Sequence, residues 1–358
     1  MNHNFSIKNH RGITEIIFSD SLDQIFKQST NSTCILYDSF FVKHIPNDLW
    51  SIPIEACESN KNLDYINILI NKILGYKFPN QIVSIGGGIV QDLSGFISAI
   101  LKRGVDWTFI PTTFASQADS CIGSKTSINV GSFKNQLGLF YAPSKVVIIP
   151  SFLQSLSSKD LYCGLGEVLH YFMQCPNQEN LDIAKQFENT ISIGSPSTEL
   201  LLKLIKESLS IKSSIIQIDE FDKDIRKVFN FGHTFGHAIE AATKNHVPHG
   251  IAVLLGIKIA LEIAEIYNND LLIKYNSLVE ESINHIHDYC RCNFDIEIYK
   301  RSLLRDKKNS VDGHIAVILP DDKPKSPELT IMNLVNLKDS IVFEKSISIL
   351  QKQKTFDL

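Results

Sequence analysis

This 358-residue chain lacks several features that direct proteins to membranes, nucleic acids or disulfide-stabilised folds. It has no run of about eighteen apolar residues, so we expect no membrane-spanning helix. Its net charge is only −4, which gives no general attraction to nucleic acid or to an anionic membrane. Its seven cysteines are scattered, and an odd number without a regular frame argues against a disulfide scaffold. The first residues lack the basic-then-apolar layout of a signal peptide, so we expect a cytoplasmic protein.

The chain has instead the composition of a globular protein, with 44% hydrophobic and 21% charged residues. The chain is longer than an ordinary domain with a single hydrophobic core, which indicates two domains. Up to about residue 150, short β-rich runs alternate with helical stretches, which predicts a mostly parallel sheet. The predicted strands cover residues 34–37, 81–85, 107–110 and 146–149, and the helices between them include 63–74 and 89–101.

Beyond residue 150 the alternation of β-rich and helical stretches ends. Helical periodicity dominates residues 153–273, including 200–216 and 249–266, and residues 345–358 indicate a terminal helix with a frayed end. We therefore predict an α/β domain over residues 1–151 and an all-α domain over residues 152–358.

Three histidines that lie close together form the most distinctive pattern in the chain. His233 and His237 are four residues apart, which places both imidazoles on one face of a helix. His249 follows a turn that contains His246 and begins another apolar stretch. Neutral imidazole is a common metal ligand and titrates near physiological pH. One of these histidines could instead pack a helix end while the others lie on the surface, but the interleaved glycines favour a metal or catalytic site.

A glycine run, Gly86 to Gly88, lies where a predicted strand passes into a predicted helix. Glycines there let the backbone approach a pyrophosphate, and the start of the helix offers free N–H groups and a positive dipole end. The run does not match the six-residue dinucleotide fingerprint, so a tight turn chosen for packing is the alternative. Asp38, at the end of the first predicted strand, is placed to accept ribose hydroxyls or simply to form a turn.

A dense polar set lies between residues 103 and 135, among small and apolar neighbours. Cations in such a segment suggest bound anions, because lysine acts there as a point charge on phosphate. A solvated loop is the alternative. The members are Arg103, Thr112, Thr113, Asp119, Lys125, Asn129, Lys134 and Asn135.

Glu167 follows Gly164-Leu-Gly166, which we expect at the start of a helix. Its carboxylate would complement two imidazoles, and two histidines with one glutamate and open positions form a catalytic zinc arrangement. A solvated glutamate in a first helical turn is the alternative, since spacing alone does not show that the three ligands converge.

Taken together, these segments resemble the 3-dehydroquinate synthase family and, more broadly, the sugar phosphate cyclases. The resemblance runs in one order from about residue 38 to about residue 312. It implies a dehydroquinate synthase-like fold, with an α/β nucleotide-binding domain followed by an all-α domain that binds metal and substrate. The segments that carry it are SIGGGIVQDLSGF at 84–96, RG at 103–104, IPTT at 110–113, DS at 119–120, KT at 125–126, KN at 134–135 and NFGHTFGHA at 230–238.

The resemblance also implies roles for individual residues. A divalent metal, Zn or Co, would be bound by Glu167, His233 and His249. NAD would be held by Asp38, Glu58, Lys61, Gly87, Gly88, Asp92, Thr112, Thr113 and Lys134, the last of which could also contact the substrate. The catalytic and substrate-binding set would be His237, Lys125, Asn135, Arg226, Asn230, Lys212, Asp119, one of Lys307 or Lys308, and Arg103, which in the family reaches a phosphate in the neighbouring subunit of a homodimer.

The sequence departs from the family pattern at four positions. His170 stands where lysine is usual, three residues after the metal glutamate. It is the departure most relevant to substrate choice or rate, because a shorter and weaker base replaces a long cation. The others are Asp222 for glutamate, Ile251 for glutamate and Ser124 for glycine.

The implied activity is that of a phosphate-eliminating carbon–oxygen lyase of the shikimate pathway. It would convert a seven-carbon sugar acid phosphate, 3-deoxy-arabino-heptulosonate 7-phosphate, to 3-dehydroquinate with release of phosphate. The metal would act as a Lewis acid on one substrate alcohol, and NAD would oxidise that alcohol transiently, with no net redox change.

Three alternatives stay open at this point. A metal-dependent polyol dehydrogenase would produce NADH, but a neutral polyol has no use for the anion-binding lysines. His170 suggests a non-catalytic or specialised relative. A cyclase for an amino substrate, or for a neutral heptulose or hexose phosphate, is the third. Arg226 favours an acid, because with Lys125 it would grip a carboxylate in the resembled enzyme.

Overall fold

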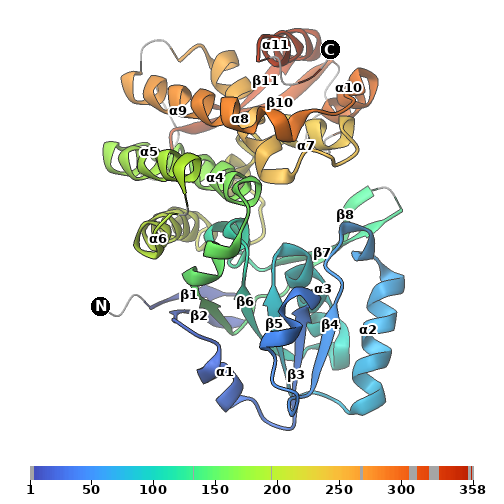
Figure 1. The fold of residues 1–358 in the computed structure, drawn as a ribbon. Helices are drawn as coiled ribbons and strands as arrows, with labels where there is room; N and C mark the ends of the chain where they lie inside the picture. The colour runs from blue at the N-terminus through green and yellow to red at the C-terminus, as the bar shows by residue number, and fades with distance from the viewer. Residues whose placement is uncertain are drawn as a thin grey trace. The chain divides into compact units, whose positions relative to one another are not determined.

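The chain divides into two compact units, Met1–Ser155 and Leu156–Leu358 (Figure 1). The computed structural model describes residues 4–131, 133–194, 196–266, 269–305, 313–321, 330–353 and 356. The boundary expected from the sequence, after residue 151, falls within η5 (Pro150–Ser155), the last element of the first unit.

A seven-stranded sheet forms the centre of the first unit. Its strands are β1 (Phe5–Asn9), β2 (Gly12–Phe18), β3 (Thr33–Asp38), β4 (Ser51–Ile54), β5 (Gln81–Gly86), β6 (Asp106–Pro111) and β9 (Lys145–Ile148). Their order is β1-β2-β9-β6-β5-β3-β4, with β1 antiparallel to β2 and the other adjacent pairs parallel. The predicted parallel sheet is thus confirmed, and the near-continuous apolar runs of its strands reflect burial on both faces.

Helices and turns cover both faces of this sheet (Figure 1). They are α1 (Asp23–Gln28), α2 (Leu63–Tyr76), α3 (Gly88–Ile100), η1 (Ser39–His44), η2 (Glu58–Asn60), η3 (Leu101–Arg103) and the π-helical turn η4 (Ser116–Ser120). On one face, Ile35, Val83 and Ile110 pack with apolar residues of α1, η1 and η5. On the other, α3 packs against β5 and β6, and α2 lies beside α3. The sheet therefore carries β5 directly into α3 at the glycine run.

An antiparallel hairpin occupies part of the polar segment for which the sequence analysis gives no secondary structure. It pairs β7 (Lys125–Val130) with β8 (Phe133–Phe140). In β7 the side chains of Thr126 and Ile128 are buried while Lys125 and Val130 are exposed. This alternation is the signal of a half-buried strand.

Helices dominate the second unit, as predicted. They are α4 (Ser158–Phe172), α5 (Gln178–Ile193), α6 (Thr198–Ile216), α7 (His233–Ala242), α8 (His249–Ala264), α9 (Asp270–Ile286), α10 (Ile296–Arg305) and α11 (Asp339–Lys352), with the short turns η6 (Ile225–Asn230) and η7 (His287–Cys290). Helix α8 is buried almost all round and packs against α4, α7, α9 and α11. It is the core helix of this unit, which explains its uniformly apolar sequence.

The second unit is not all-α, which corrects the sequence prediction. The strands β10 (His314–Pro320) and β11 (Met332–Lys338) form an antiparallel pair, and β10 packs against α8. The buried run from Ile315 to Leu319 is short and continuously apolar. Such a run does not distinguish a buried strand from a helical segment by periodicity, so the prediction missed it.

The second unit depends on backbone contact between α4 and α8. A Cβ atom on Gly166 would lie less than 3.0 Å from the carbonyl oxygen of Gly250, and one on Gly250 would lie equally close to the carbonyl oxygen of Cys163. Gly256 of α8 meets Gly232, the residue before α7, in the same way. The three helices can approach this closely only because these positions lack side chains.

No helix in the described part of the chain is both long enough and apolar enough to cross a membrane. All seven cysteines are free thiols, and Cys34, Cys121 and Cys290 are buried.

We predict that Gly250→Ala destabilises the second unit by about 3 kcal/mol, because the new methyl group has only backbone atoms to displace. For a unit of this size the unfolding midpoint should fall by roughly 6–12 °C in a thermal melt. Gly75→Ala is the matched control, because its Cβ would meet nothing within 4 Å. Equal melting temperatures for the two variants would contradict the proposed backbone contact.

Candidate functional site

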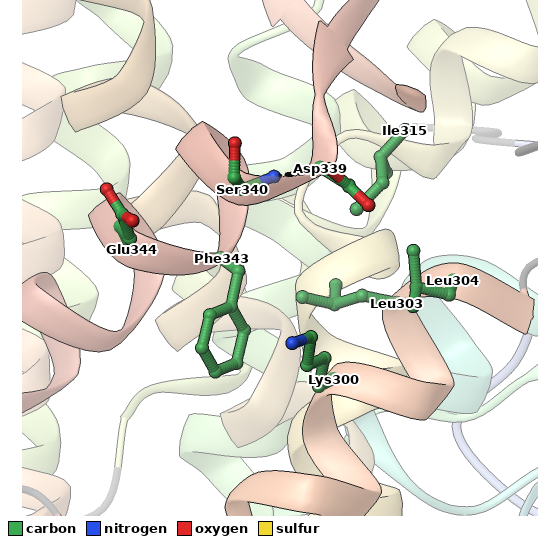
Figure 2. Close-up of a pocket in the computed structure, with 8 residues that line it drawn as sticks. All are labelled: Lys300, Leu303, Leu304, Ile315, Asp339, Ser340, Phe343 and Glu344. Carbon is green, nitrogen blue, oxygen red and sulfur yellow. Dashed lines mark hydrogen bonds between the residues drawn. The ribbon is translucent and has the colours of Figure 1, made fainter. Parts of the chain in front are cut away.

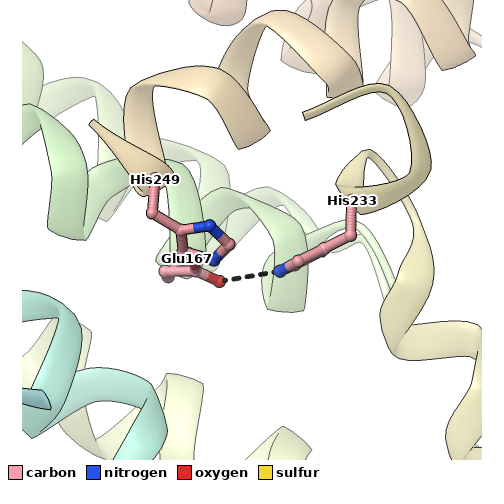
Figure 3. Close-up of side chains that lie close together, drawn as sticks. All are labelled: Glu167, His233 and His249. Carbon is pink, nitrogen blue, oxygen red and sulfur yellow. Dashed lines mark ion pairs between the residues drawn. The ribbon is translucent and has the colours of Figure 1, made fainter. Parts of the chain in front are cut away.

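Glu167, His233 and His249 converge in the second unit from three different helices (Figure 3). Glu167 lies on α4, and His233 and His249 are the first residues of α7 and α8. Nε2 of His233 is 3.6 Å from Oε2 of Glu167, and Nε2 of His249 is 3.1 Å from Oε1 of the same carboxylate. The three side chains therefore turn their donor atoms toward one point.

The position of Glu167 within its helix differs from the prediction. We expect it in a first turn, but α4 begins nine residues earlier at Ser158, where the Ser157 side chain caps the helix by accepting from the Asp160 N–H. Glu167 is buried, with only 2% of its side chain exposed. The alternative of a solvated glutamate at a helix start is therefore wrong.

Hydrogen bonds to the other ring nitrogens orient both imidazoles. Nδ1 of His249 is 2.9 Å from Oε2 of Glu240, and Nδ1 of His233 is 3.2 Å from the carbonyl oxygen of Phe231. Both partners are acceptors, so each Nδ1 carries the hydrogen and each neutral ring presents its Nε2 lone pair to Glu167. A lone pair facing a carboxylate requires a cation between them, either a proton or a metal ion.

The electrostatics of the cluster point the same way. Burial alone would raise the pKa of the Glu167 carboxyl, but His233, His249 and His170 hold it well below its usual value. Partial desolvation opposes the charged form of His249, yet the carboxylates of Glu240 and Glu167 raise the pKa of this imidazole well above its ordinary value. The cluster thus attracts positive charge to the Nε2 side of His249.

The distances fit a metal ion. Ligand atoms about 2.1 Å from a tetrahedral zinc ion lie about 3.4 Å from one another. The separation of His249 Nε2 from Oε1 of Glu167, 3.1 Å, and that of His233 Nε2 from Oε2, 3.6 Å, lie on either side of that value. Oε1 of Glu167 is buried and has no hydrogen-bond partner among the described residues, although His249 lies close to it. This donor set therefore suits a divalent metal with an open coordination position.

Two further histidines lie beside this cluster. The ring of His237 is 5.5 Å from the rings of both His233 and His249, and it stacks on His249 at 23°. Desolvation, followed by repulsion from His249 and His233, lowers the pKa of His237 to about 3. His170 is fully buried, and its Nδ1 is 2.9 Å from the carbonyl oxygen of Phe231, the same oxygen that orients His233. His237 is thus an uncharged imidazole beside the cluster, while His170 has no exposed surface.

The glycine run in the first unit forms the start of α3. Gly87 precedes the helix and, because it has no side chain, does not cap the N-terminus of α3. A Cβ on Gly87 would lie 2.8 Å from Cγ2 of Thr113, whereas one on Gly88 would meet nothing within 4 Å. The amide of Thr112 donates to the carbonyl of Gly86 at 3.0 Å, which ties the next strand end to the turn. Gly87 thus has a packing role, and Gly88 borders open space.

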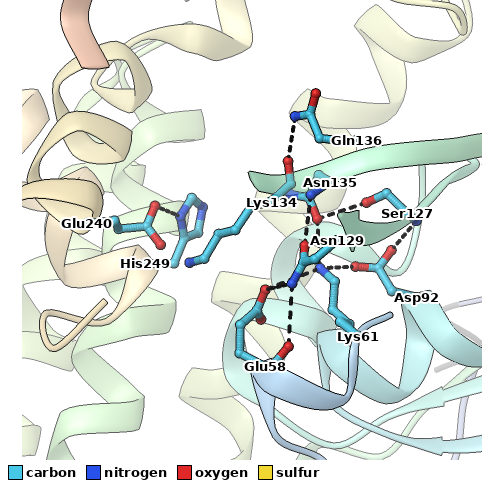
Figure 4. Close-up of polar contacts among 10 residues, drawn as sticks. All are labelled: Glu58, Lys61, Asp92, Ser127, Asn129, Lys134, Asn135, Gln136, Glu240 and His249. Carbon is cyan, nitrogen blue, oxygen red and sulfur yellow. Dashed lines mark hydrogen bonds and ion pairs between the residues drawn. The ribbon is translucent and has the colours of Figure 1, made fainter. Parts of the chain in front are cut away.

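Several residues that the family resemblance predicts to bind NAD are joined by hydrogen bonds and an ion pair in the first unit (Figure 4). Nζ of Lys61 is 2.8 Å from Oδ2 of Asp92 and donates to Oδ1 of Asn135 at 2.7 Å. Asn129 donates to Oε1 of Glu58 at 2.8 Å and accepts from the Asn135 amide at 2.8 Å. Burial raises the pKa of Asp92 despite the attraction of Lys61. The network links α3, η2 and the β7–β8 hairpin.

The remaining predicted residues of the first unit are spread over several elements. Asp38 ends β3, and its side chain accepts from the Phe40 amide at 3.0 Å, as expected of a turn former. Arg103 is exposed in η3, with a positive φ of 66°. Asp119 lies in η4, Lys125 begins β7, and Lys134 lies in β8.

In the second unit, two predicted cationic residues are buried. Lys212 on α6 is 5% exposed, with its Nζ 5.8 Å from the centre of the Tyr171 ring. Arg226 in η6 is also 5% exposed, and its guanidinium donates to the carbonyl oxygen of Glu220. Asn230 donates to the Lys227 carbonyl at 2.7 Å. Lys307 and Lys308 lie outside the described residues.

Glu240 is the residue at this cluster that the sequence analysis missed. It lies three residues after His237 on α7, so helical spacing puts the two side chains on one face. Glu240, His237 and His249 also form a second group of closely spaced donor atoms. The spacing of three residues between His237 and Glu240 was the available signal, but a glutamate at that spacing on a helix is common without any functional role.

A pocket of about 300 Å³ lies elsewhere in the second unit, between α10, β10 and α11 (Figure 2). Leu303, Ile315 and Phe343 give it an apolar wall, and Nζ of Lys300 lies 5.3 Å from the Phe343 ring centre. Its lining, within the part of the chain that the structure describes, includes none of the predicted site residues.

Comparisons with known proteins identify the family. Models described as 3-dehydroquinate synthase N-terminal and 3-dehydroquinate synthase C-terminal match residues 51–163 and 164–309. A curated 3-dehydroquinate synthase from Natranaerobius thermophilus is 35% identical over 273 residues, which cover 75% of this chain and 74% of that protein.

Two solved structures share the fold. A 2-deoxy-scyllo-inosose synthase complexed with carbaglucose-6-phosphate, NAD+ and Co2+ has a TM-score of 0.78 at 21% identity, over 96% of this chain and 99% of that one. ValA, the 2-epi-5-epi-valiolone synthase from Streptomyces hygroscopicus subsp. jinggangensis 5008 with NAD+ and Zn2+ bound, has a TM-score of 0.74 at 19% identity, over 95% and 96% of the two chains. The family models and the curated relative show that this chain belongs to the 3-dehydroquinate synthase family of phosphate-eliminating lyases.

Proposed function

We propose that this enzyme is an NAD- and metal-dependent cyclase that converts 3-deoxy-arabino-heptulosonate 7-phosphate to 3-dehydroquinate and phosphate. The observation that carries the proposal is the convergence of Glu167, His233 and His249 at spacings suited to one metal ion. The substrate is proposed from the name of the curated relative, a 3-dehydroquinate synthase, together with the buried guanidinium of Arg226.

Glu167, His233 and His249 would hold the metal, Zn or Co, and the ion would supply a Lewis acid for a substrate alcohol. Bound Co2+ and Zn2+ in the two cyclases of the same fold support this choice of ions. His237 stands beside the ligands with its pKa lowered to about 3, so it is uncharged at physiological pH and is proposed to contact a substrate hydroxyl by a hydrogen bond.

NAD would be bound by the first unit, where it would supply a reversible hydride acceptor for a reaction without net redox change. The N-terminus of α3 supports this, because the N–H groups of a helix start suit a pyrophosphate, Gly87 offers no side-chain cap and Gly88 borders open space. Asp38, Thr112, Thr113 and Lys134 are proposed to complete the site, together with the network of Lys61, Glu58 and Asp92.

Lysine and arginine side chains are proposed to bind the anionic groups of the substrate. Arg226 is the choice for the carboxylate, because a guanidinium binds it through a planar two-pronged contact. Arg103, exposed in η3, is proposed to reach the phosphate bound by the partner subunit of a homodimer. Lys212, Lys125, Asn135, Asn230 and Asp119 remain proposed catalytic or substrate contacts.

A cyclase for a different sugar phosphate is the second candidate. It is favoured by His170, a fully buried imidazole where the family pattern has a lysine, and by the fold shared with a 2-deoxy-scyllo-inosose synthase. The polyol dehydrogenase alternative gains no support from the family models, which describe a 3-dehydroquinate synthase and match residues 51–163 and 164–309.

We predict that His233→Ala abolishes metal binding and phosphate release together, because one of three protein ligands is lost. Metal content after dialysis, measured by elemental analysis, and phosphate release give the two readouts. His246→Ala, at an exposed histidine in the turn before α8, is the control and should behave as wild type. Full metal occupancy in the His233 variant would rule out this metal centre.

We predict that Gly88→Ala weakens NAD binding by roughly 10-fold or more, a loss of at least 1.4 kcal/mol, by placing a methyl group between the α3 backbone and the pyrophosphate. Its folding should be unaffected, because the Cβ meets nothing within 4 Å. Isothermal titration of NAD against wild type, Gly88→Ala and the control Gly75→Ala tests this. Unchanged affinity in the Gly88 variant would move the cofactor site away from this turn.

The substrate is tested by Arg226→Lys. If the substrate is an acid, the change should cost about 2–4 kcal/mol of transition-state binding, since a desolvated charge pair loses its geometry. That is roughly 30- to 900-fold in kcat/KM. Phosphate release should be measured for the heptulosonate phosphate and for a neutral heptulose phosphate, with NADH absorbance followed in parallel. A wild type that prefers the neutral sugar would overturn the dehydroquinate assignment, and stoichiometric NADH would overturn the cyclase.

A further inference from the structure

Glu240 stands directly behind one of the three proposed metal ligands (Figure 4). Its Oε2 is 2.9 Å from Nδ1 of His249, and Nε2 of the same ring is 3.1 Å from Oε1 of Glu167. The imidazole thus lies between two carboxylates, one on α7 and one on α4. Only the Nε2 side faces the point where the three ligand atoms meet.

The ring orientation of His249 depends on its contact with Glu240 more than that of His233 depends on its contact with the Phe231 carbonyl. The side chain of His249 is 46% exposed, whereas that of His233 is 15% exposed. His249 is the first residue of α8, and Pro248 before it offers no side-chain cap. His233 is oriented by a backbone carbonyl, that of Phe231, which no side-chain substitution removes. A half-exposed ring at a helix start needs a side-chain partner to stay in one orientation.

Glu240 is suited to that role because it is itself fixed. It is 6% exposed on α7, the helix that also carries His233 and His237. Its backbone carbonyl accepts from the Asn245 amide at 2.7 Å, which holds the end of the helix. A buried carboxylate that accepts the Nδ1 hydrogen sets the tautomer of His249 and makes Nε2 a better electron donor.

We propose that Glu240 is the positioning residue of the metal centre, which fixes the ring orientation and the tautomer of His249. This inference rests on the proposed function, in that it assumes a metal between Glu167, His233 and His249. Glu240 would act through His249, whose Nδ1 it contacts, and it is not a member of the ligand group Glu167, His233 and His249.

The test compares Glu240→Ala and Glu240→Gln with wild type. Glutamine keeps an acceptor of the same length but loses the charge, whereas alanine loses both. Outer hydrogen-bond partners of metal ligands typically contribute 10- to 100-fold in metal affinity. We therefore expect Zn2+ binding, measured by competition with a chromophoric chelator, to weaken about 10- to 100-fold in the alanine variant and by less than about 10-fold in the glutamine variant.

Glu188→Gln is the matched control. Glu188 is another buried carboxylate of this unit, 3% exposed, and it contacts Nδ1 of His285 at 2.5 Å. It is not part of either donor group. Its substitution removes the charge from a similar Glu–His pair that lies outside the donor groups, so it should leave Zn2+ affinity unchanged.

A spectroscopic readout separates positioning from a general loss of stability. In the Co2+-loaded protein, the visible d–d bands report the geometry at the ion, and we expect them to change in both Glu240 variants and to match wild type in Glu188→Gln. If the alanine variant does not fold, the glutamine variant decides by its affinity and spectrum. Wild-type affinity and an unchanged spectrum in the Glu240 variants would overturn the positioning role. Failure of the wild type to bind Zn2+ or Co2+ would instead overturn the metal centre itself.

Discussion

The contact of three helix backbones at glycines is the constraint on which the second unit depends. Gly166 and Gly250 let α4 and α8 touch, and Gly232 and Gly256 do the same for α7 and α8. Each proposed metal ligand is the neighbour of one of these glycines in the sequence. The close helix contacts and the proposed metal ligands therefore lie at adjacent positions, because helices that approach at the backbone also bring the neighbouring side chains within reach of one ion.

Charge balance is the second constraint on this site. Two buried carboxylates, Glu167 and Glu240, flank the imidazole of His249. Burying a carboxylate is costly unless a cation or hydrogen-bond donors compensate it. The imidazoles supply part of that compensation, and a divalent ion at the Nε2 side would supply the rest. The burial of two carboxylates at this site therefore favours a bound cation.

The sequence predicted much of the fold because several segments carry unmistakable local patterns. The apolar runs that became β3, β5, β6 and β9, and the periodic stretches that became α2, α3, α6 and α8, lie within a few residues of their predicted limits. The hairpins formed by β7 with β8 and by β10 with β11 were missed. Their strands are stabilised by each other and by packing on helices, which a short window of sequence does not record.

For the site, the sequence by itself determined which residues are candidate ligands and which of them share a helix. Two histidines four residues apart must share a helix face, and a glycine run between strand and helix must form a tight turn. Only the tertiary structure decided that Glu167 lies deep within α4, that Glu240 stands behind His249, and that Lys61 pairs with Asp92. These relations join residues from different elements, and they arise from helix packing over long sequence separations. Local spacing determines what one helix or turn presents, whereas the close approach of several elements determines which of those groups meet.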